Sequence, residues 1–254
     1  MRRILILGGT SEARELAARL AQRNDLAVTL SLAGRTAAPA AQAVPVRSGG
    51  FGGKAGLAAY LTEHHIDALI DATHPFAANI SANAAQAVTT TGVPLLTLQR
   101  PPWQMIAGDR WIDVNDVDEA VGALGATPRR VFLAIGRQDV NAFVAAPQHA
   151  YVVRSIDPVE PPLALPHAEY SLARGPFDTS AECELITTRG IGIVVAKNSG
   201  GEATYGKIAA ARALRLPVVM IRRPPAPTGP TVATIDAAAA WLDHALASAT
   251  RRGV

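Results

Sequence analysis

A glycine turn near the start of the chain could bind a phosphate group. The apolar stretch "RILIL" leads into Gly8 and Gly9, which Thr10, Ser11 and Glu12 follow. Two glycines let the backbone bend sharply and approach a ligand, and the N–H groups at the start of a following helix attract anions. The alternative is a plain strand-to-helix turn capped by Thr10 or Ser11. We expect these five residues to hold the phosphates of a nucleotide.

The second expected strand ends on an arginine where a dinucleotide site often has an acid. That acid accepts hydrogen bonds from the ribose hydroxyls of NAD. Here the strand ends in "LSLAGRT", which puts Gly34, Arg35 and Thr36 at this point and no carboxylate. A guanidinium suits a 2′-phosphate, which it can bind through two charge-assisted hydrogen bonds. The sequence therefore predicts NADPH as the cofactor, with an exposed loop arginine as the alternative.

A histidine follows another expected strand, in the stretch "DATHPFA". Thr73 and His74 would lie at the carboxyl edge of the sheet, and Pro75 is expected to open the next helix as its first residue. We expect these three residues to contact the cofactor. His74 is also a candidate catalytic residue, and a purely structural histidine is the alternative.

Two strand ends in the second half of the chain carry groups that could bind carboxylates. The stretch "IGRQD" supplies an arginine, and "AKNSGG" supplies a lysine, an amide, a hydroxyl and two glycines. We expect a carboxylate-bearing substrate to be bound by Arg137, Lys197, Asn198, Ser199, Gly200 and Gly201. Lys197 is the second candidate catalytic residue. The loop "GEATYGK" has the spacing of a phosphate loop, but Ile208 replaces the hydroxyl that would bind Mg²⁺.

These residues must be positioned by strands and helices that alternate along the chain. Short apolar runs alternate with helical patterns, which predicts doubly wound parallel sheets of the α/β class. Strands are expected at 3–8, 27–32, 43–46, 67–72, 94–98, 130–136, 151–155, 191–197 and 217–221. Helices are expected at 11–23, 54–64, 77–91, 115–124, 179–189, 204–214 and 236–248. The proline-rich segment 156–177 is expected to form a loop.

An internal similarity indicates two halves of related build. The stretches "PLLTLQRPP" (94–102) and "PVVMIRRPP" (217–225) align without gaps. We therefore expect an N-terminal NADPH-binding domain over 1–100 and a C-terminal α/β domain over 101–254 that completes a substrate cleft. Ligands of such sheets lie beyond the carboxyl ends of the strands.

Composition narrows the classes of partner. The 254 residues are 49% apolar and carry a net charge of +3. The basic residues are dispersed, whereas a nucleic-acid binder more often shows a basic stripe. Cys183 is the one cysteine and the histidines are scattered, so no disulfide and no metal site are expected. No apolar run suits a membrane span or a signal peptide. We expect a cytoplasmic protein, favoured as a monomer, that binds a small molecule and neither nucleic acid nor membrane.

Five motifs together resemble the precorrin-6A reductase family of cobalamin biosynthesis. They are, in chain order, "ILILGGTSEAREL", "AGRT", "GGFGG", "DATHPFA" and "KNSGG". The resemblance implies two Rossmann-like domains with parallel sheets and a ligand cleft between them. It adds Gly52, within "GGFGG", to the cofactor-binding residues.

The resemblance also implies an activity. It is the NADPH-dependent reduction of precorrin-6A to precorrin-6B by hydride transfer to C19 of the macrocycle. The substrate bears acetate and propionate arms, which agrees with the arginines and lysines expected around its site. The alternatives are a non-catalytic NADPH-binding module and a different enzyme of the tetrapyrrole pathway, such as a methyltransferase. The "VGxGPGD" turn typical of those methyltransferases is absent.

Overall fold

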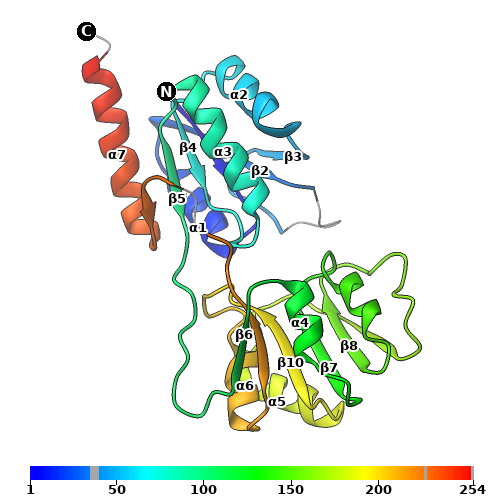
Figure 1. Cartoon of the computed structure of the whole chain (residues 1–254). Coiled ribbons are helices and arrows are strands. Elements are labelled where there is room, and N and C mark those ends of the chain that lie inside the picture. The colour runs from blue at the N-terminus through cyan, green and yellow to red at the C-terminus, as the bar shows by residue number, and fades with distance from the viewer. Residues whose placement is uncertain (35–39, 226–227, 253–254) are drawn as a thin grey trace. The chain divides into compact units, whose positions relative to one another are not determined.

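The computed structural model divides the chain into two units (Figure 1). Unit 1 comprises residues 1–100 and 225–254, and unit 2 comprises residues 101–224. The structure describes residues 1–34, 40–225 and 228–252, with side chains up to residue 248. Residue 100, the expected end of the N-terminal domain, is also the last residue of the first segment of unit 1.

Unit 1 contains one parallel sheet of six strands. Its strands are β1 (Arg2–Leu7), β2 (Leu26–Leu32), β3 (Val46–Ser48), β4 (Ala68–Asp71), β5 (Leu95–Leu98) and β12 (Thr231–Val232). They are ordered β3-β2-β1-β4-β5-β12, and all neighbours run parallel. Its helices are α1 (Ser11–Leu20), α2 (Gly53–Glu63), α3 (Ala78–Thr91) and α7 (Ile235–Arg252). The strand order reverses between β1 and β4, the point at which such sheets bind ligands.

The central strand β1 is buried on both faces of this sheet. Ile4 and Ile6 lie in one apolar cluster with residues of α1 and α7. Leu5 and Leu7 lie in a second cluster with residues of α2 and α3. Because alternate side chains of a strand point to opposite faces, the two helical layers bury all four positions from Ile4 to Leu7, and all four are apolar. This explains the continuous apolar run of the sequence.

Helix α7 belongs to unit 1, although it lies at the end of the chain. Ala238, Leu242 and Leu246 are buried in the same cluster as Ile4 and Ile6, and the helix packs against α1 and β5. The expected C-terminal domain of 101–254 included this helix, so the structure differs from that boundary. Burial of the apolar stripe decides where a helix packs, and neighbourhood in the sequence does not.

Unit 2 contains a second parallel sheet of six strands. They are β6 (Trp111–Val114), β7 (Arg130–Ala134), β8 (Ala150–Ser155), β9 (Ala168–Leu172), β10 (Ile193–Lys197) and β11 (Val218–Ile221). The order is β9-β8-β7-β10-β11-β6, and all neighbours are parallel. Its helices are α4 (Val117–Ala123), α5 (Thr179–Thr188) and α6 (Gly206–Ala213), with a 3₁₀ helix η1 (Val140–Ala145). The expected α/β class with parallel Rossmann-like sheets is confirmed.

The two sheets share one strand order. If the strands are numbered in chain order from β1 in unit 1 and from β7 in unit 2, strands 1 to 5 of each sheet are arranged 3-2-1-4-5. The shared order confirms two halves of related build. The sixth strand has a different origin in each. Strand β12 pairs with β5 after the chain has passed through unit 2, and β6 precedes β7 but pairs with β11.

The short strands at the sheet edges are the ones that the sequence did not predict. Strands β6, β9 and β12 were not expected, β3 begins at Val46 rather than at 43, and the expected loop 156–177 contains β9. Tyr170 and Leu172 of β9 are exposed. An edge strand with exposed apolar side chains gives no clean buried run, so periodicity does not reveal it.

A buried histidine makes the stability of unit 2 depend on pH. His149, just before β8, is fully buried. Its Nδ1 accepts from the Arg129 N–H at 3.2 Å, so Nε2 carries the proton and donates to the Gly125 carbonyl at 3.1 Å. Burial lowers the pKa of His149 below its ordinary value of 6.5.

Near and below pH 6.5, His149 is therefore protonated to a greater extent in the unfolded chain than in the folded chain. We expect the unfolding free energy of unit 2 to fall as the pH drops below 6.5, by at most about 1.4 kcal/mol per pH unit. Urea titrations at pH 7.5, 6.5 and 5.5 measure this loss. His149→Gln should abolish this loss of unfolding free energy at acid pH. His167→Gln, at an exposed histidine, should leave the loss in place. An equal acid loss in His149→Gln would contradict the assignment.

Candidate functional site

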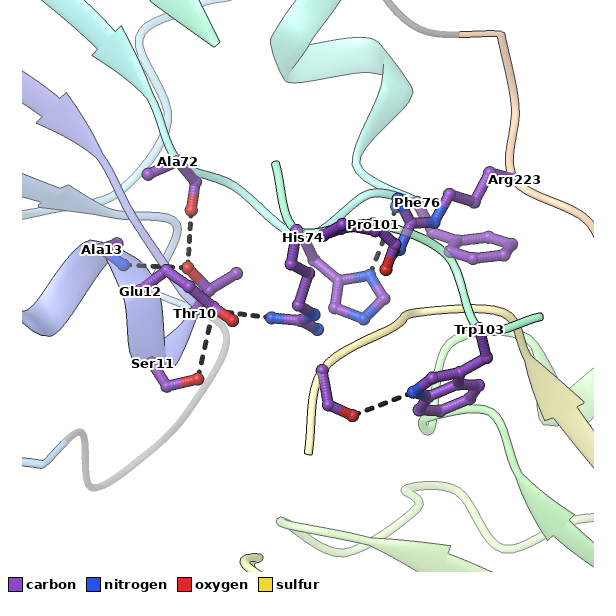
Figure 2. A network of polar contacts seen from close by, with 12 residues as sticks. Thr10, Ser11, Glu12, Ala13, Ala72, His74, Phe76, Pro101, Trp103 and Arg223 are labelled. Carbon is purple, nitrogen blue, oxygen red and sulfur yellow. Dashed lines mark hydrogen bonds and ion pairs between the residues drawn. The ribbon is translucent and has the colours of Figure 1, made fainter. Parts of the chain in front are cut away.

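The turn after β1 is bonded to the end of β4 by one hydroxyl. Thr10 Oγ1 donates to the Ala72 carbonyl at 2.8 Å and accepts from the Ala13 N–H at 3.1 Å (Figure 2). Thr10 is therefore the N-cap of α1, the alternative that the sequence left open. Because the hydroxyl is used inside the protein, the groups that remain for a ligand here are backbone N–H groups of the first helical turn.

The two glycine positions of this turn favour glycine for different structural reasons. Gly8 donates its N–H to the Ser31 carbonyl at 2.9 Å, and a Cβ there would lie 2.6 Å from Leu30 Cδ1. Gly9 has a φ of +120°, and a Cβ there would meet nothing within 4 Å. The absence of a side chain at Gly8 thus lets the turn pack closely against β2. The absence of a side chain at Gly9 leaves the backbone of the turn uncovered.

The carboxylate of Glu12 is neutralised by an arginine that the sequence did not single out. Glu12 Oε2 lies 2.7 Å from Arg100 Nη1, and the two side chains are 22% and 15% exposed. The same oxygen accepts from Ser11 Oγ at 3.1 Å. Arg100 lies two residues after the end of β5. Its position just after an expected strand was the one feature of the sequence that could have marked it as a site residue.

The loop after β2 approaches the loop after β3. Gly34 has a φ of +72°, and a Cβ there would lie 3.1 Å from Ser48 Oγ. The Gly49 N–H donates to the Leu32 carbonyl at 2.9 Å. Arg35 and Thr36 lie outside the residues that the structure describes, so their predicted contact with a 2′-phosphate stays a prediction.

A second arginine that sequence reasoning missed orders the loop after β3. Arg47 donates to the carbonyls of Gly49 and Gly50, the latter at 2.7 Å, and its guanidinium lies 3.7 Å from the centroid of the Phe51 ring. Gly52, an expected cofactor residue, is the N-cap of α2 with a φ of +79°. The loop is thus held beside the end of β2, at the carboxyl edge of the sheet.

The turn after β4 is held by a buried carboxylate. Asp71 is 2% exposed, and its Oδ1 accepts from the Thr73 N–H at 3.1 Å and from Thr73 Oγ1 at 2.7 Å. The hydroxyl of Thr73 is therefore oriented toward the end of the strand. Its expected contact with the cofactor stays a prediction.

His74 and Pro75 lie in the turn itself, at the carboxyl edge. Nδ1 of His74 accepts from the Phe76 N–H at 3.3 Å (Figure 2). Pro75 does not open the helix, because α3 begins at Ala78 with Ala77 as its N-cap. Pro75 and Phe76 form a turn before the helix. The prediction that Pro75 is the first residue of the helix was therefore wrong.

The corresponding edge of unit 2 carries the two expected basic residues. Lys197 ends β10, and its Nζ pairs with the Asp139 carboxylate. Arg137 Nη1 donates to the Pro158 carbonyl at 3.3 Å. Strands β7 and β10 are neighbours at which the strand order reverses, so Arg137 and Lys197 lie at the place where such a sheet binds ligands.

The loop after Lys197 also anchors the segment that enters unit 2. Asn198 Oδ1 accepts from the Trp103 N–H at 2.8 Å, and its Nδ2 donates to the Trp103 carbonyl at 3.0 Å. The indole Nε1 donates to the Gly201 carbonyl at 2.9 Å. Ser199 is buried, and Gly200 has a φ of +65°. The amide of Asn198 thus has a structural use, and a substrate contact for this loop stays a prediction.

The expected residues divide cleanly between the units. All the cofactor candidates that the structure describes lie in unit 1, and all the substrate candidates lie in unit 2. Within the described residues, no group of three histidine, cysteine or acidic side chains could hold a metal ion. No helix of the described part of the chain is long and apolar enough to cross a membrane.

Comparison with known proteins places these features in a family. The family model described as precorrin-6x reductase CbiJ/CobK matches residues 3–243. A precorrin-6A reductase of Sinorhizobium sp is 56% identical, over 97% of this chain and 95% of that protein. One of Rhodobacter capsulatus is 52% identical, over 100% of both chains.

A solved structure supports the same assignment. The structure titled CobK precorrin-6A reductase matches with a TM-score of 0.92 and 50% sequence identity, over 96% of this chain and 97% of that one. Sequence and fold therefore agree along nearly the whole length. The chain belongs to the precorrin-6x reductase CbiJ/CobK family.

Proposed function

We propose that the protein reduces precorrin-6A to precorrin-6B with NADPH, by hydride transfer to C19 of the macrocycle. The observation that carries the proposal is the family match over residues 3–243, with relatives named precorrin-6A reductase at 56% and 52% identity. No feature of the described residues favours the alternatives of a non-catalytic NADPH-binding module or a different enzyme of the pathway.

The carboxyl edge of unit 1 fits the diphosphate of a dinucleotide. Gly9 exposes a bare backbone at the turn, and α1 begins directly after it with its N-cap satisfied from within by Thr10. The remaining N–H groups of the first turn and the helix dipole favour an anion. Gly8, Gly9, Thr10, Ser11 and Glu12 would contact it mainly through the backbone.

The adenosine end would lie at the ends of β2 and β3. Gly34 and Gly52 keep positive φ angles there, and Arg47 fixes the loop between β3 and α2. Arg35 and Thr36 would bind the 2′-phosphate, by the chemistry of guanidinium and hydroxyl groups toward phosphate. The turn of Thr73, His74 and Pro75 would lie beside the reacting end of the coenzyme.

Bound NADPH supplies the hydride, and the protein supplies position and charge. Arg137 and Lys197 would pair with carboxylate arms of the macrocycle. Lys197 is bonded to Asp139, so a substrate carboxylate would replace or join this partner. His74 and Lys197 are the groups proposed to hold a proton at the reacting end, and Asn198, Ser199, Gly200 and Gly201 would shape the loop around the substrate.

Absorbance at 340 nm tests the activity. Purified protein with precorrin-6A and NADPH should consume the nucleotide in proportion to the precorrin supplied, with precorrin-6B as the product. Omission of either reactant is the control. If the protein binds NADPH but does not consume it, the proposed reductase activity is wrong and the protein is a non-catalytic NADPH-binding module.

Arg35→Ala should separate the two coenzymes. Loss of a charge-assisted contact costs about 1.5–3 kcal/mol, or roughly ten- to a hundredfold in affinity. We expect the Kd for NADPH to rise by this factor and the Kd for NADH to change little, measured by nucleotide fluorescence. Arg3→Ala, at the opposite edge of the sheet, is the matched control. An equal loss for both coenzymes would place the 2′-phosphate elsewhere.

A further inference from the structure

The ion pair between Arg100 and Glu12 spans the carboxyl edge of unit 1. Glu12 is the second residue of α1, which follows β1, and Arg100 follows β5. Strand β4 lies between β1 and β5 in the sheet, so the pair crosses over the end of β4. The Oε2 and Nη1 atoms are 2.7 Å apart, and both side chains are largely withdrawn from solvent.

An acid in this position poses a problem for a phosphate site. A carboxylate in the first turn of a helix is favoured by the same N–H groups and the same dipole that favour a bound phosphate. Two anions would therefore compete for one end of α1. Ser11 adds a further hydrogen bond to the carboxylate at 3.1 Å, which fixes the acid close to the turn.

We propose that Arg100 is a positioning residue for the coenzyme, which neutralises Glu12 and holds it aside so that the start of α1 accepts the diphosphate. This inference rests on the proposed use of NADPH. Arg100 acts through Glu12, and its effect concerns the diphosphate, which NADPH and NADH share. Its loss should therefore weaken both coenzymes, in contrast to the loss of Arg35.

Four variants test the inference by coenzyme titration. Arg100→Met should raise the Kd of both NADPH and NADH by about ten- to a hundredfold, because an unpaired carboxylate then faces the diphosphate. Glu12→Gln should lower both Kd values by about three- to tenfold, because the anion that competes with the diphosphate is gone while Arg100 keeps its charge. The double variant should return to within about threefold of the wild-type values, since neither charge remains. Arg100→Lys should keep most of the affinity.

Kinetics and a matched pair provide the controls. Arg100→Met should raise the KM for NADPH and leave kcat at saturation unchanged, which a general loss of structure would not do. Arg2→Met breaks an ion pair of 2.8 Å with Asp67 at the other edge of the same sheet, and it should leave both coenzyme affinities unchanged.

The outcomes separate this inference from the proposed function. If the wild-type protein binds no NADPH, the proposed coenzyme is wrong and the inference falls with it. If the wild type binds and Arg100→Met binds equally well, only the inference is overturned. A double variant as weak as Arg100→Met would also overturn it, because Arg100 would then bind the coenzyme directly.

Discussion

Replacing Glu182 with alanine should lower the unfolding free energy of unit 2 by about 3–5 kcal/mol. Glu182 of α5 and Arg154 of β8 form an ion pair whose side chains are 3% and 7% exposed. The guanidinium also lies 4.8 Å from the Phe132 ring centroid and 3.8 Å from that of Phe177. Truncation of the acid leaves a positive charge among aromatic rings, and that desolvated charge is the source of the loss.

Tryptophan fluorescence during urea unfolding measures this effect in unit 2 alone. Trp103 and Trp111 lie in unit 2 and Trp241 in unit 1, so the titration is best done in a Trp241→Phe background. Glu169→Ala, which breaks an exposed pair network with Arg130 and Arg189, should cost less than about 1 kcal/mol.

A double substitution tests the cause. Arg154→Met with Glu182→Leu removes both charges and should recover stability to within about 1 kcal/mol of the wild type, because apolar residues of similar size replace buried pairs well. A double variant as unstable as Glu182→Ala would show that packing, rather than the unpaired charge, caused the loss.

Replacing Gly200 with alanine should cost unit 2 about 2–6 kcal/mol, as the sum of backbone strain and overpacking. The φ of Gly200 is +65°, and a Cβ there would lie 2.0 Å from the Pro101 carbonyl oxygen and 2.5 Å from Arg223 Nη2. Arg223 also donates to the Asn198 carbonyl at 2.7 Å. The loop must therefore move away from the segment that it anchors.

Gly190 provides a matched control for this substitution. It has a φ of +59°, but a Cβ there would meet nothing within 4 Å. Gly190→Ala should therefore show the conformational cost alone, about 1–2 kcal/mol. The same fluorescence titration compares the two variants. Equal losses would mean that the contact with Pro101 is relieved without cost.

Much of the fold could be predicted because its strands are buried on both faces. The apolar runs of β1, β4, β7 and β10 are continuous, and the helices between them follow at regular spacing, so the parallel sheets were evident. The sequence did not predict that α7 packs in unit 1, because an apolar stripe does not reveal which of the two sheets a helix covers. The edge strands were missed since half of their side chains meet solvent.

The site shows the same division between local and distant information. The glycine turn and the turn after β4 were found because a strand end and its following residues are adjacent in the sequence. Arg100 and the clamp of Asn198 on Trp103 were missed, because the pairs Arg100–Glu12 and Asn198–Trp103 are 88 and 95 residues apart. Sequence reasoning could place Arg100 at the right edge of the sheet but could not name the residue that it meets.

The late sixth strand of unit 1 has a consequence for synthesis on the ribosome. The N–H groups of Thr97 and Gln99 donate to the carbonyls of Pro230 and Val232, each at 2.9 Å. Until those carbonyls emerge, a nascent chain presents the outer side of β5 as an unpaired edge, which invites association with other chains. Unit 2 has all its strands by residue 221. We therefore expect the middle of the polypeptide to mature before its beginning, and chains released prematurely near residue 225 to aggregate through β5.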